Sequence, residues 1–273
     1  MNEVLEDLNK AQQEAVRQTE GPVLILAGAG SGKTKTLTHR MAYLLFEDLA
    51  KADQILAVTF TNKAANEMKT RVNDLLFKYN IYTTLPYLGT FHGIAVKLLR
   101  EIAANFKDLV SYNSDFIIYD SIDQTAVLRQ IHKDLGLSKD LTVGFLSHQI
   151  SNAKNNCYDE ETLAESNNGD IDPKVIEVYK NYQSILRQAN AFDFDDLLFV
   201  LVRVLEDNNQ ITEYYQEKFK YLMIDEYQDT NRCQYLLTKL LCNPKLNNIC
   251  VVGDDWQSIY SWRAADFGNI LNF

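Results

Sequence analysis

The segment Ala27-Gly-Ala-Gly-Ser-Gly-Lys-Thr34 constrains the fold more than any other part of this 273-residue chain. It follows an apolar run, residues 22–27, that is typical of a buried strand, and it leads into a helical pattern over residues 32–46. A glycine-rich turn between a strand and a helix lets the backbone wrap closely around phosphate groups, because the amides at the helix N-terminus point at the anion. The sequence therefore predicts a phosphate-binding loop within an α/β domain.

The side chains of this loop indicate a nucleotide bound with Mg²⁺. A lysine at the position of Lys33 contacts the outer phosphates, and Thr34 supplies a hydroxyl ligand for the metal. The strict pattern has glycine where this chain has Ala27, a difference of one methyl group. A plain strand-to-helix turn would have no packing purpose for Lys-Thr at this spacing. We expect the loop to hold ATP through Ala29, Gly30, Ser31, Gly32, Lys33, Thr34 and Lys35.

Apolar runs and helical patterns alternate over residues 1–110 and again over residues 192–273. Continuous apolar strands separated by helices indicate a parallel sheet covered on both faces. Over residues 111–191 helical patterns dominate, with one short strand candidate at 116–119. The sequence therefore predicts an α/β domain interrupted by a mainly helical insertion. The further strands are expected at 55–59, 87–90, 221–225 and 248–253, and the further helices at 63–78, 91–105, 123–135, 143–155, 173–188 and 232–241.

A pair of adjacent acidic residues reduces the number of reactions that a phosphate-binding loop could serve. The predicted strand at 221–224 ends in Asp225-Glu226, so it would deliver Asp225 beside the phosphate loop to hold Mg²⁺. Glu226 can polarise the attacking water as a general base. Adjacent acids at a strand end could simply be solvated, but a phosphate loop in the same chain disfavours that interpretation. Two carboxylates with separate roles favour hydrolysis over transfer to a metabolite, and the sequence predicts an ATPase site.

Charge, cysteine spacing and hydropathy argue against a general nucleic-acid-binding protein, a cysteine-based metal site and a membrane-spanning protein. The net charge of −10, from 27 basic and 37 acidic residues, argues against indiscriminate nucleic-acid binding, although screening leaves room for a local groove. The four cysteines have no metal-binding spacing, and we expect reduced thiols: Cys157, Cys233, Cys242 and Cys250. No apolar run approaches the roughly 18 residues of a membrane span. The N-terminus is acidic, so we expect a soluble, cytoplasmic protein.

Several ordered segments make the chain resemble the first motor domain of a superfamily 1A DNA helicase of the Rep/UvrD/PcrA group. Residues 8–16 are similar to the family's Q motif, residues 27–34 to motif I, 59–65 to motif Ia and 89–92 to motif Ib. Residues 192–198 resemble a family segment that follows the insertion, 224–230 resemble motif II, and 252–263 resemble motif III. The resemblance implies a RecA-like P-loop NTPase fold, with motor domain 1A at 1–110 and 192–273 and insertion 1B at 111–191.

The resemblance assigns further residues to the nucleotide. Gln12 would read adenine, and Gln257 would sense the γ-phosphate beside the catalytic residues Lys33, Asp225 and Glu226. Arg263 would sit between nucleotide and DNA, unless it is a structural ion-pair partner. Arg40 would touch the nucleotide, with an ordinary surface cation as the alternative.

A second set of residues would bind single-stranded DNA. Phe60 and Trp262 offer flat faces for base stacking, which tolerates any sequence. Short polar groups suit backbone phosphates, and a motor that moves along any sequence needs contacts of that kind. Core packing is the alternative for Phe60 and Tyr260, and a satisfied polar role is the alternative for His92. The full set is Thr59, Phe60, Thr61, Asn62, Thr90, His92, Tyr260 and Trp262.

The resemblance also sets expectations for the whole protein. Family members carry a second motor domain (2A/2B) with motifs IV to VI, so we expect an N-terminal fragment that is poorly active alone. The expected activity is ATP- and Mg²⁺-dependent 3′→5′ movement on single-stranded DNA and at single-strand/double-strand junctions, in replication or repair. The alternatives are the motor part of a helicase–nuclease and a non-motor DNA-binding regulator. In motif III the chain departs from the family at Trp256, Ser261 and Ala264.

Overall fold

The computed structural model describes residues 3–28, 30–166 and 171–254. Two compact units are present. Unit 1 comprises Met1–Ile94, Asn209–Thr230 and Gln234–Phe273, and unit 2 comprises Ala95–Asn208 and Asn231–Cys233. The chain therefore leaves unit 1 after Ile94 and returns to it at Asn209, and three later residues, Asn231–Cys233, also belong to unit 2.

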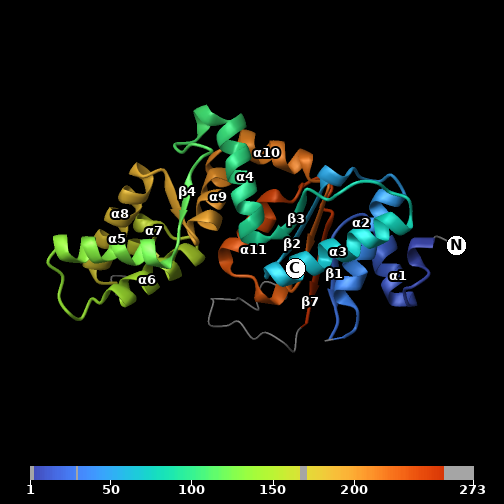
Figure 1. Cartoon of the computed structure of the whole chain (residues 1–273), viewed down its shortest axis with the longest axis horizontal. Helices are drawn as coiled ribbons and strands as arrows, with labels where there is room; N and C mark the ends of the chain where they lie inside the picture. The colour runs from blue at the N-terminus through green and yellow to red at the C-terminus, as the bar shows by residue number, and fades with distance from the viewer. Residues whose placement is uncertain (1–2, 29, 167–170, 255–273) are drawn as a thin grey trace. The chain divides into compact units, whose positions relative to one another are not determined.

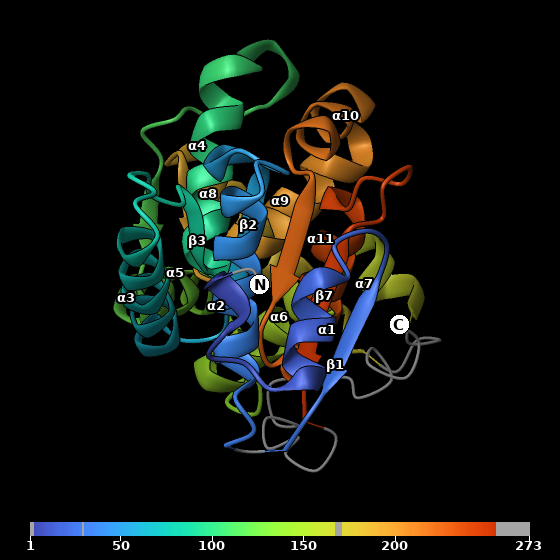
Figure 2. The ribbon, with the colours of Figure 1, turned by 90° about the vertical axis from the view of Figure 1, so that its right-hand side faces the viewer.

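Unit 1 is built on a five-stranded parallel sheet with the order β1-β7-β6-β2-β3 (Figure 1). The order inserts the last two described strands, β6 and β7, between β1 and β2, so segments far apart in sequence lie side by side. In Figure 2, β1 forms one border of the sheet with β7 beside it. The parallel α/β architecture predicted from the sequence is confirmed. The strands are β1 (Val23–Leu26), β2 (Ile55–Thr59), β3 (Tyr87–Thr90), β6 (Tyr221–Ile224) and β7 (Ile249–Gly253).

Helices α2 and α3 bury one apolar face each in the core of unit 1. Leu37, Met41 and Leu44 of α2 recur at helical spacing and join Met68 and Val72 of α3 in one buried cluster. The same cluster holds residues of β2, β6 and β7, so the core fixes the phosphate-loop helix against the sheet. The helical segments are η1 (Glu3–Leu5), α1 (Lys10–Arg17), α2 (Lys33–Phe46), η2 (Ala52–Gln54), α3 (Asn62–Lys78), α10 (Asn209–Lys218), η4 (Tyr227–Asp229) and α11 (Arg232–Leu241), whose first two residues belong to unit 2.

Unit 2 is mainly helical, as predicted. Its core gathers Leu128, Leu146, Ile150, Val178 and Tyr182. A short parallel pair, β4 with β5, is its only sheet among the described residues. The elements are α4 (Phe91–Asn105), which starts in unit 1, η3 (Lys107–Leu109), β4 (Ile117–Tyr119), α5 (Ser121–Asp134), α6 (Val143–Asn155), α7 (Glu160–Ser166), α8 (Pro173–Gln188), β5 (Ala191–Asp193) and α9 (Asp196–Asp207).

A buried ion cluster fixes α6, β5 and α9 to one another. The Nζ atom of Lys154 lies 2.7 Å from Asp193 Oδ2 and 2.8 Å from Asp196 Oδ1, and all three side chains are buried. The hydroxyl of Tyr182 donates to Asp193 at 2.9 Å. Burial raises the pKa of Asp196 to about 6, and the charge of Lys154 opposes that rise. Two of the acids in residues 192–198 therefore have a structural role inside unit 2.

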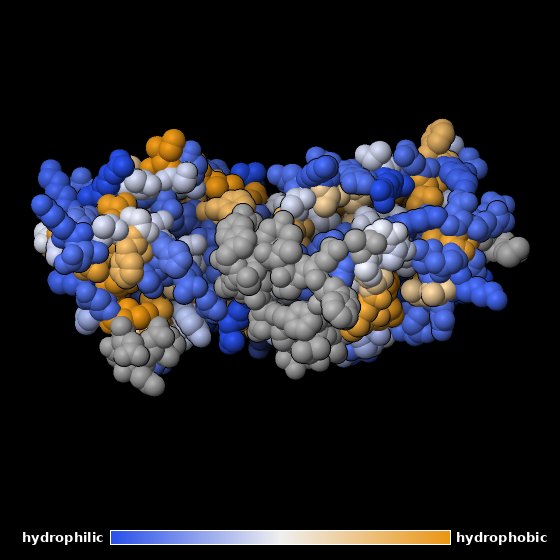
Figure 3. Space-filling view, turned by 90° about the horizontal axis from the view of Figure 1, so that it is seen from below, coloured by the Kyte–Doolittle hydropathy of each residue, from blue (hydrophilic) through white to orange (hydrophobic). Residues whose placement is uncertain are grey.

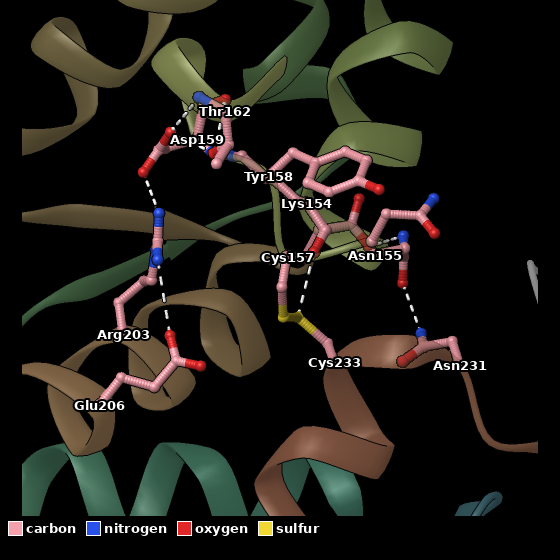
Figure 4. Close-up of a disulfide and its surroundings, with 12 residues drawn as sticks. Lys154, Asn155, Cys157, Tyr158, Asp159, Thr162, Arg203, Glu206, Asn231 and Cys233 are labelled. Atoms are coloured by element: carbon pink, nitrogen blue, oxygen red, sulfur yellow. Dashed lines mark hydrogen bonds and ion pairs between the residues drawn. A yellow bond between two sulfur atoms is a disulfide. The ribbon is translucent and has the colours of Figure 1, made fainter. Parts of the chain in front are cut away.

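Two of the four cysteines form a disulfide, which corrects the expectation of four reduced thiols. Cys157 and Cys233 are bonded across 76 residues of sequence, with their Cα atoms 5.5 Å apart (Figure 4). Beside the bond, Asn231 donates from its amide to Asn155 at 2.6 Å. Cys242 and Cys250 are free, and burial raises the pKa of the Cys250 thiol to about 11.

Figure 3 shows one face of the molecule, coloured by hydropathy. On the face seen in Figure 3, hydrophilic side chains predominate and apolar ones gather in small separate patches. Among the described residues, no helix has the length and apolar character needed to cross a membrane.

Candidate nucleotide-binding site

The phosphate loop joins the end of β1 to the start of α2. Gly30 (φ 76°) and Gly32 (φ 87°) have left-handed backbones, which glycine adopts without steric cost. Helix α2 begins directly after them at Lys33, so its first-turn amides face the loop. A Cβ on Gly32 would lie 2.7 Å from the side-chain amide nitrogen of Gln12, so the end of that side chain would have to shift.

Lys33 lies across the base of the loop. Its Nζ atom donates to the carbonyl oxygen of Ala27 at 2.9 Å and lies 3.4 Å from Asp254 Oδ2. Asp254 follows β7 and is 1% exposed. The sheet order places β7 beside β1, which brings this carboxylate to the loop. Sequence reasoning missed Asp254, although its position directly after a predicted strand is a signal for this edge of the sheet.

The two predicted metal ligands, Thr34 and Asp225, lie next to each other. The Thr34 hydroxyl donates to Asp225 Oδ2 at 3.3 Å. Burial, followed by the charge of Glu226, raises the pKa of Asp225 to about 6. A hydroxyl and one carboxylate are the hard oxygen ligands that suit Mg²⁺, which keeps several waters and takes few protein ligands. A cation here would also offset the cost of the buried carboxylate, so the residues fit the metal.

Glu226 follows Asp225 in a left-handed conformation with φ 52° and ψ 44°. Such a backbone in a residue other than glycine is uncommon and often marks a functional position. The Nε2 atom of Gln228 donates to Glu226 Oε2 at 2.8 Å. Gln228 was not among the predicted residues, and its place inside motif II was the available signal.

Gln12 reaches the loop from α1. Its side chain and that of Asn9 form a reciprocal capping box at the start of this helix. The Nε2 atom of Gln12 also donates to the carbonyl oxygen of Ser31 at 2.9 Å. Lys35, one residue beyond the loop threonine, donates to the carbonyl oxygen of Asp7. The structure therefore brings the predicted adenine reader against the phosphate loop.

The prediction that Arg40 contacts the nucleotide is wrong, and so is the surface-cation alternative. The side chain is 1% exposed and donates to the carbonyl oxygens of Ala15 at 2.6 Å and Thr19 at 3.2 Å. Burial lowers the pKa of its guanidinium. Arg40 therefore fixes the C-terminal end of α1 to α2, behind the site.

The predicted DNA-binding residues that the structure describes lie where β2 and β3 end. These strands pair in parallel with Thr59 opposite Thr90, and each is followed by a helix, α3 and α4. The hydroxyl of Thr61 accepts from the backbone amide of Ala64, and that of Thr90 accepts from Gly93, both at 3.1 Å. Two helix N-termini at one edge favour the binding of anions such as phosphate.

Within this set the structure separates exposed from buried side chains. Thr61 and Asn62 are exposed, and Thr90, His92 and Phe60 are partly buried. The ring of Phe60 packs edge-on against Phe91, with centroids 5.5 Å apart.

The prediction of a side-chain contact between Thr59 and DNA is wrong. Thr59 is 1% exposed, and its hydroxyl donates to the carbonyl oxygen of Thr61 at 3.3 Å. It therefore braces the turn after β2. Some predicted positions lie outside the described residues, namely Ala29, Gln257, Tyr260, Trp262 and Arg263, with the motif III departures Trp256, Ser261 and Ala264.

Unit 1 has the features of the P-loop class of nucleotide-binding proteins. These are a parallel sheet of this order, a glycine loop that ends in Lys33 and Thr34, and Asp225 facing that loop. Residues 8–273 match the family model described as the UvrD/REP helicase N-terminal domain. The chain belongs to that family.

Curated relatives support the same assignment. The chain is 46% identical over its whole length to an ATP-dependent DNA helicase PcrA of Staphylococcus epidermidis. It is 44% identical to the proteins of that name from Bacillus subtilis and Staphylococcus aureus, again over its whole length. The chain spans 36% of the length of each of these relatives.

Proposed function

We propose that this chain is the ATP-binding motor portion of a DNA helicase that hydrolyses ATP with Mg²⁺ and moves 3′→5′ on single-stranded DNA. The observation that carries the proposal is the 3.3 Å contact between Thr34 and Asp225, with Glu226 directly beside it. A nucleotide-binding fold without hydrolysis has no need of a second carboxylate at that position. The direction of movement and a role in replication or repair rest on family membership alone.

In this proposal each residue of the site has a separate task. Lys33 leaves the carbonyl of Ala27 and binds the outer phosphates, which carry more negative charge. Thr34 and Asp225 would hold Mg²⁺, which supplies neutralisation of the phosphate charge when bound. Glu226 accepts a proton from the attacking water.

The edge formed by β2 and β3 is the proposed path of the DNA strand. The exposed residues Thr61 and Asn62 and the two helix N-termini offer backbone amides and short polar groups to phosphates. Such contacts carry no base preference, which suits a protein that moves along any sequence. We infer that the chain contacts the DNA backbone in the same way at single-strand/double-strand junctions.

We also infer a second motor domain as the partner of this chain, because the relatives named above extend well beyond the matched region. Arginines supplied across such a site are worth about 10³–10⁵ in kcat in other P-loop enzymes. The chain alone is therefore expected to bind ATP but to hydrolyse it slowly.

The test is a titration of the fluorescent analogue mant-ATP with Mg²⁺ into the chain and its Lys33→Ala variant. Saturable binding that falls at least about tenfold in the variant supports the proposal. The matched control is Lys69→Ala, which removes an exposed lysine of α3 and should bind like the parent. Equal binding by parent and Lys33→Ala would contradict the ATP site and favour the non-motor DNA-binding alternative.

A further inference from the structure

The side chain of Gln228 uses both ends of its amide inside the candidate site. It is 1% exposed and lies in η4, which begins directly after the two acids that follow β6. Its nitrogen donates to Glu226 Oε2 at 2.8 Å, and its oxygen accepts the backbone N–H of Asp254 at 3.1 Å. One buried side chain thus joins the predicted general base to the end of β7.

The connection continues to the phosphate loop. Asp254, whose backbone N–H is held by Gln228, pairs through its own carboxylate with Lys33 at 3.4 Å. Glu226, Gln228, Asp254 and Lys33 therefore form one series of hydrogen-bonded groups, all in unit 1. The series joins the proposed water-activating end of the site to its phosphate-binding end.

The hydrogen bond from Gln228 restrains the carboxylate of Glu226. Its backbone has the uncommon left-handed conformation, and its carboxylate can still rotate about the side-chain bonds. Within the described part of the chain, the Gln228 amide is the hydrogen-bond donor found on that carboxylate. A general base must be held within hydrogen-bond reach of the water it activates, so the donor on its other side matters for catalysis.

We propose that Gln228 is a positioning residue for hydrolysis: it holds the Glu226 carboxylate in its working orientation and couples it to Asp254, directly after β7. The inference rests on the proposed ATPase function. It goes further in assigning a task to a residue that acts through its hydrogen bond to Glu226. Replacing a purely structural glutamine would leave the preference of the protein for the transition state of hydrolysis over the bound product unchanged.

The test compares the affinity for ADP with the affinity for ADP plus aluminium fluoride, each measured with Mg²⁺. Aluminium fluoride mimics the phosphoryl group in the transition state of its transfer. Only groups aligned for the reaction favour the second complex. The variant is Gln228→Met, which keeps the length of the side chain and removes both hydrogen bonds. The matched control is Gln216→Met, because Gln216 also donates from a half-buried amide, to the carbonyl oxygen of Leu240 at 2.9 Å, outside the site.

The parent and Gln216→Met are expected to bind the aluminium fluoride complex at least about tenfold more tightly than ADP. Gln228→Met should bind ADP like the parent but lose that preference to within about threefold. If Gln228→Met does not fold, Gln228→Asn gives the same test, since a side chain shorter by one methylene cannot span both partners.

A retained preference in the folded variant overturns the inference, as does a parent without any preference. Failure of the parent to bind ADP or mant-ATP at all would instead reject the ATP site itself, and the inference with it. The two failures are therefore distinguishable.

Discussion

The hydroxyl of Thr34 and the carboxylate of Asp225 are 3.3 Å apart although 191 residues separate them in sequence. The parallel order of β1, β7 and β6 creates this proximity, because the carboxyl ends of parallel strands meet at one edge of the sheet. The pair is the geometric centre of the proposed ATP site, and its consequences can be tested without turnover.

Thr34→Val should abolish the effect of Mg²⁺ on nucleotide affinity. Valine keeps the shape of threonine but has no hydroxyl oxygen for the metal. We expect Mg²⁺ to tighten mant-ATP binding by the parent about tenfold or more and to leave the variant within about threefold. Titrations with Mg²⁺ and with EDTA measure this difference. Thr34→Ser, which retains the hydroxyl, is the matched control, and a serine variant that also loses the Mg²⁺ effect would contradict the assignment.

Gly32→Ala should lower both stability and nucleotide binding. The left-handed backbone at φ 87° costs about 1–2 kcal/mol for a residue with a Cβ, and that Cβ would press on the amide of Gln12. Gly28→Ala is the matched control, since nothing lies within 4 Å of a Cβ there and its φ is not left-handed. Thermal melts of the two variants should differ by several degrees, with Gly32→Ala lower. Equal melting temperatures would show that the loop conformation adapts.

The strands and helices that the sequence predicted are those with apolar patterns bounded by turn residues, such as β2 and α3. Helix α9 was missed because Asp196–Asp207 is a nearly continuous apolar run, and periodicity alone cannot separate a buried helix from a buried strand. Strand β5 has three residues, too few to show alternation.

The difference between local sequence patterns and tertiary packing also explains which site residues could be predicted. Lys33, Thr34 and Asp225 were predictable because their spacing reflects chemistry that phosphate and Mg²⁺ impose. Gln228 was not, because its contact with Asp254 depends on which strand lies beside β6. The burial of Arg40 and the long-range Cys157–Cys233 bond likewise depend on packing that no local pattern records.

Asp229→Asn should stabilise the protein at neutral pH. The Asp229 side chain is 7% exposed, and its Oδ1 atom has no hydrogen-bond partner within the described residues. Burial, followed by the charge of Glu226, raises the pKa of Asp229 from 3.8 to about 6. Ionisation of this carboxyl therefore costs stability as the pH rises from about 4 to about 6, and the full cost remains above that range.

After allowance for solvent screening, the gain from Asp229→Asn should be about 1 kcal/mol at pH 8 and smaller at pH 5. Melting temperatures at the two pH values measure it. Asp74→Asn, which changes an exposed carboxylate of α3, is the control and should melt like the parent at both. A gain from Asp229→Asn that is larger at pH 5 than at pH 8 would contradict the sign of this argument.

Reduction of the Cys157–Cys233 disulfide should destabilise the fold. The bond links residues 76 positions apart in sequence. Such cross-links restrict the unfolded chain and so raise the free energy of unfolding by about 2–4 kcal/mol. Urea unfolding with and without dithiothreitol measures the loss, and Cys157→Ser should reproduce it under oxidising conditions. The control is Cys242→Ser, which removes a free thiol. Identical unfolding curves with and without reductant would show that the bond is absent in solution.

Asn62→Asp should weaken DNA binding while it stabilises helix α3. The two effects can therefore be told apart by experiment. Asn62 is exposed at the first position of α3, where a negative charge favours the helix dipole by about 0.3–1 kcal/mol. The same charge repels a phosphate backbone at the edge formed by β2 and β3. We therefore expect a slightly higher melting temperature and an affinity for fluorescein-labelled oligo(dT) that is about threefold to tenfold weaker at low salt.

The loss of oligo(dT) affinity in Asn62→Asp should shrink as salt is added, since the repulsion is screened. Asn209→Asp places the same charge at the first residue of α10 and should bind oligo(dT) like the parent. Fluorescence anisotropy at two salt concentrations measures all three proteins. Because Asn62→Asp does not weaken the helix, reduced binding could not be attributed to unfolding. Unchanged binding would move the DNA path away from this edge, and an equal loss in Asn209→Asp would reduce the effect to net charge alone.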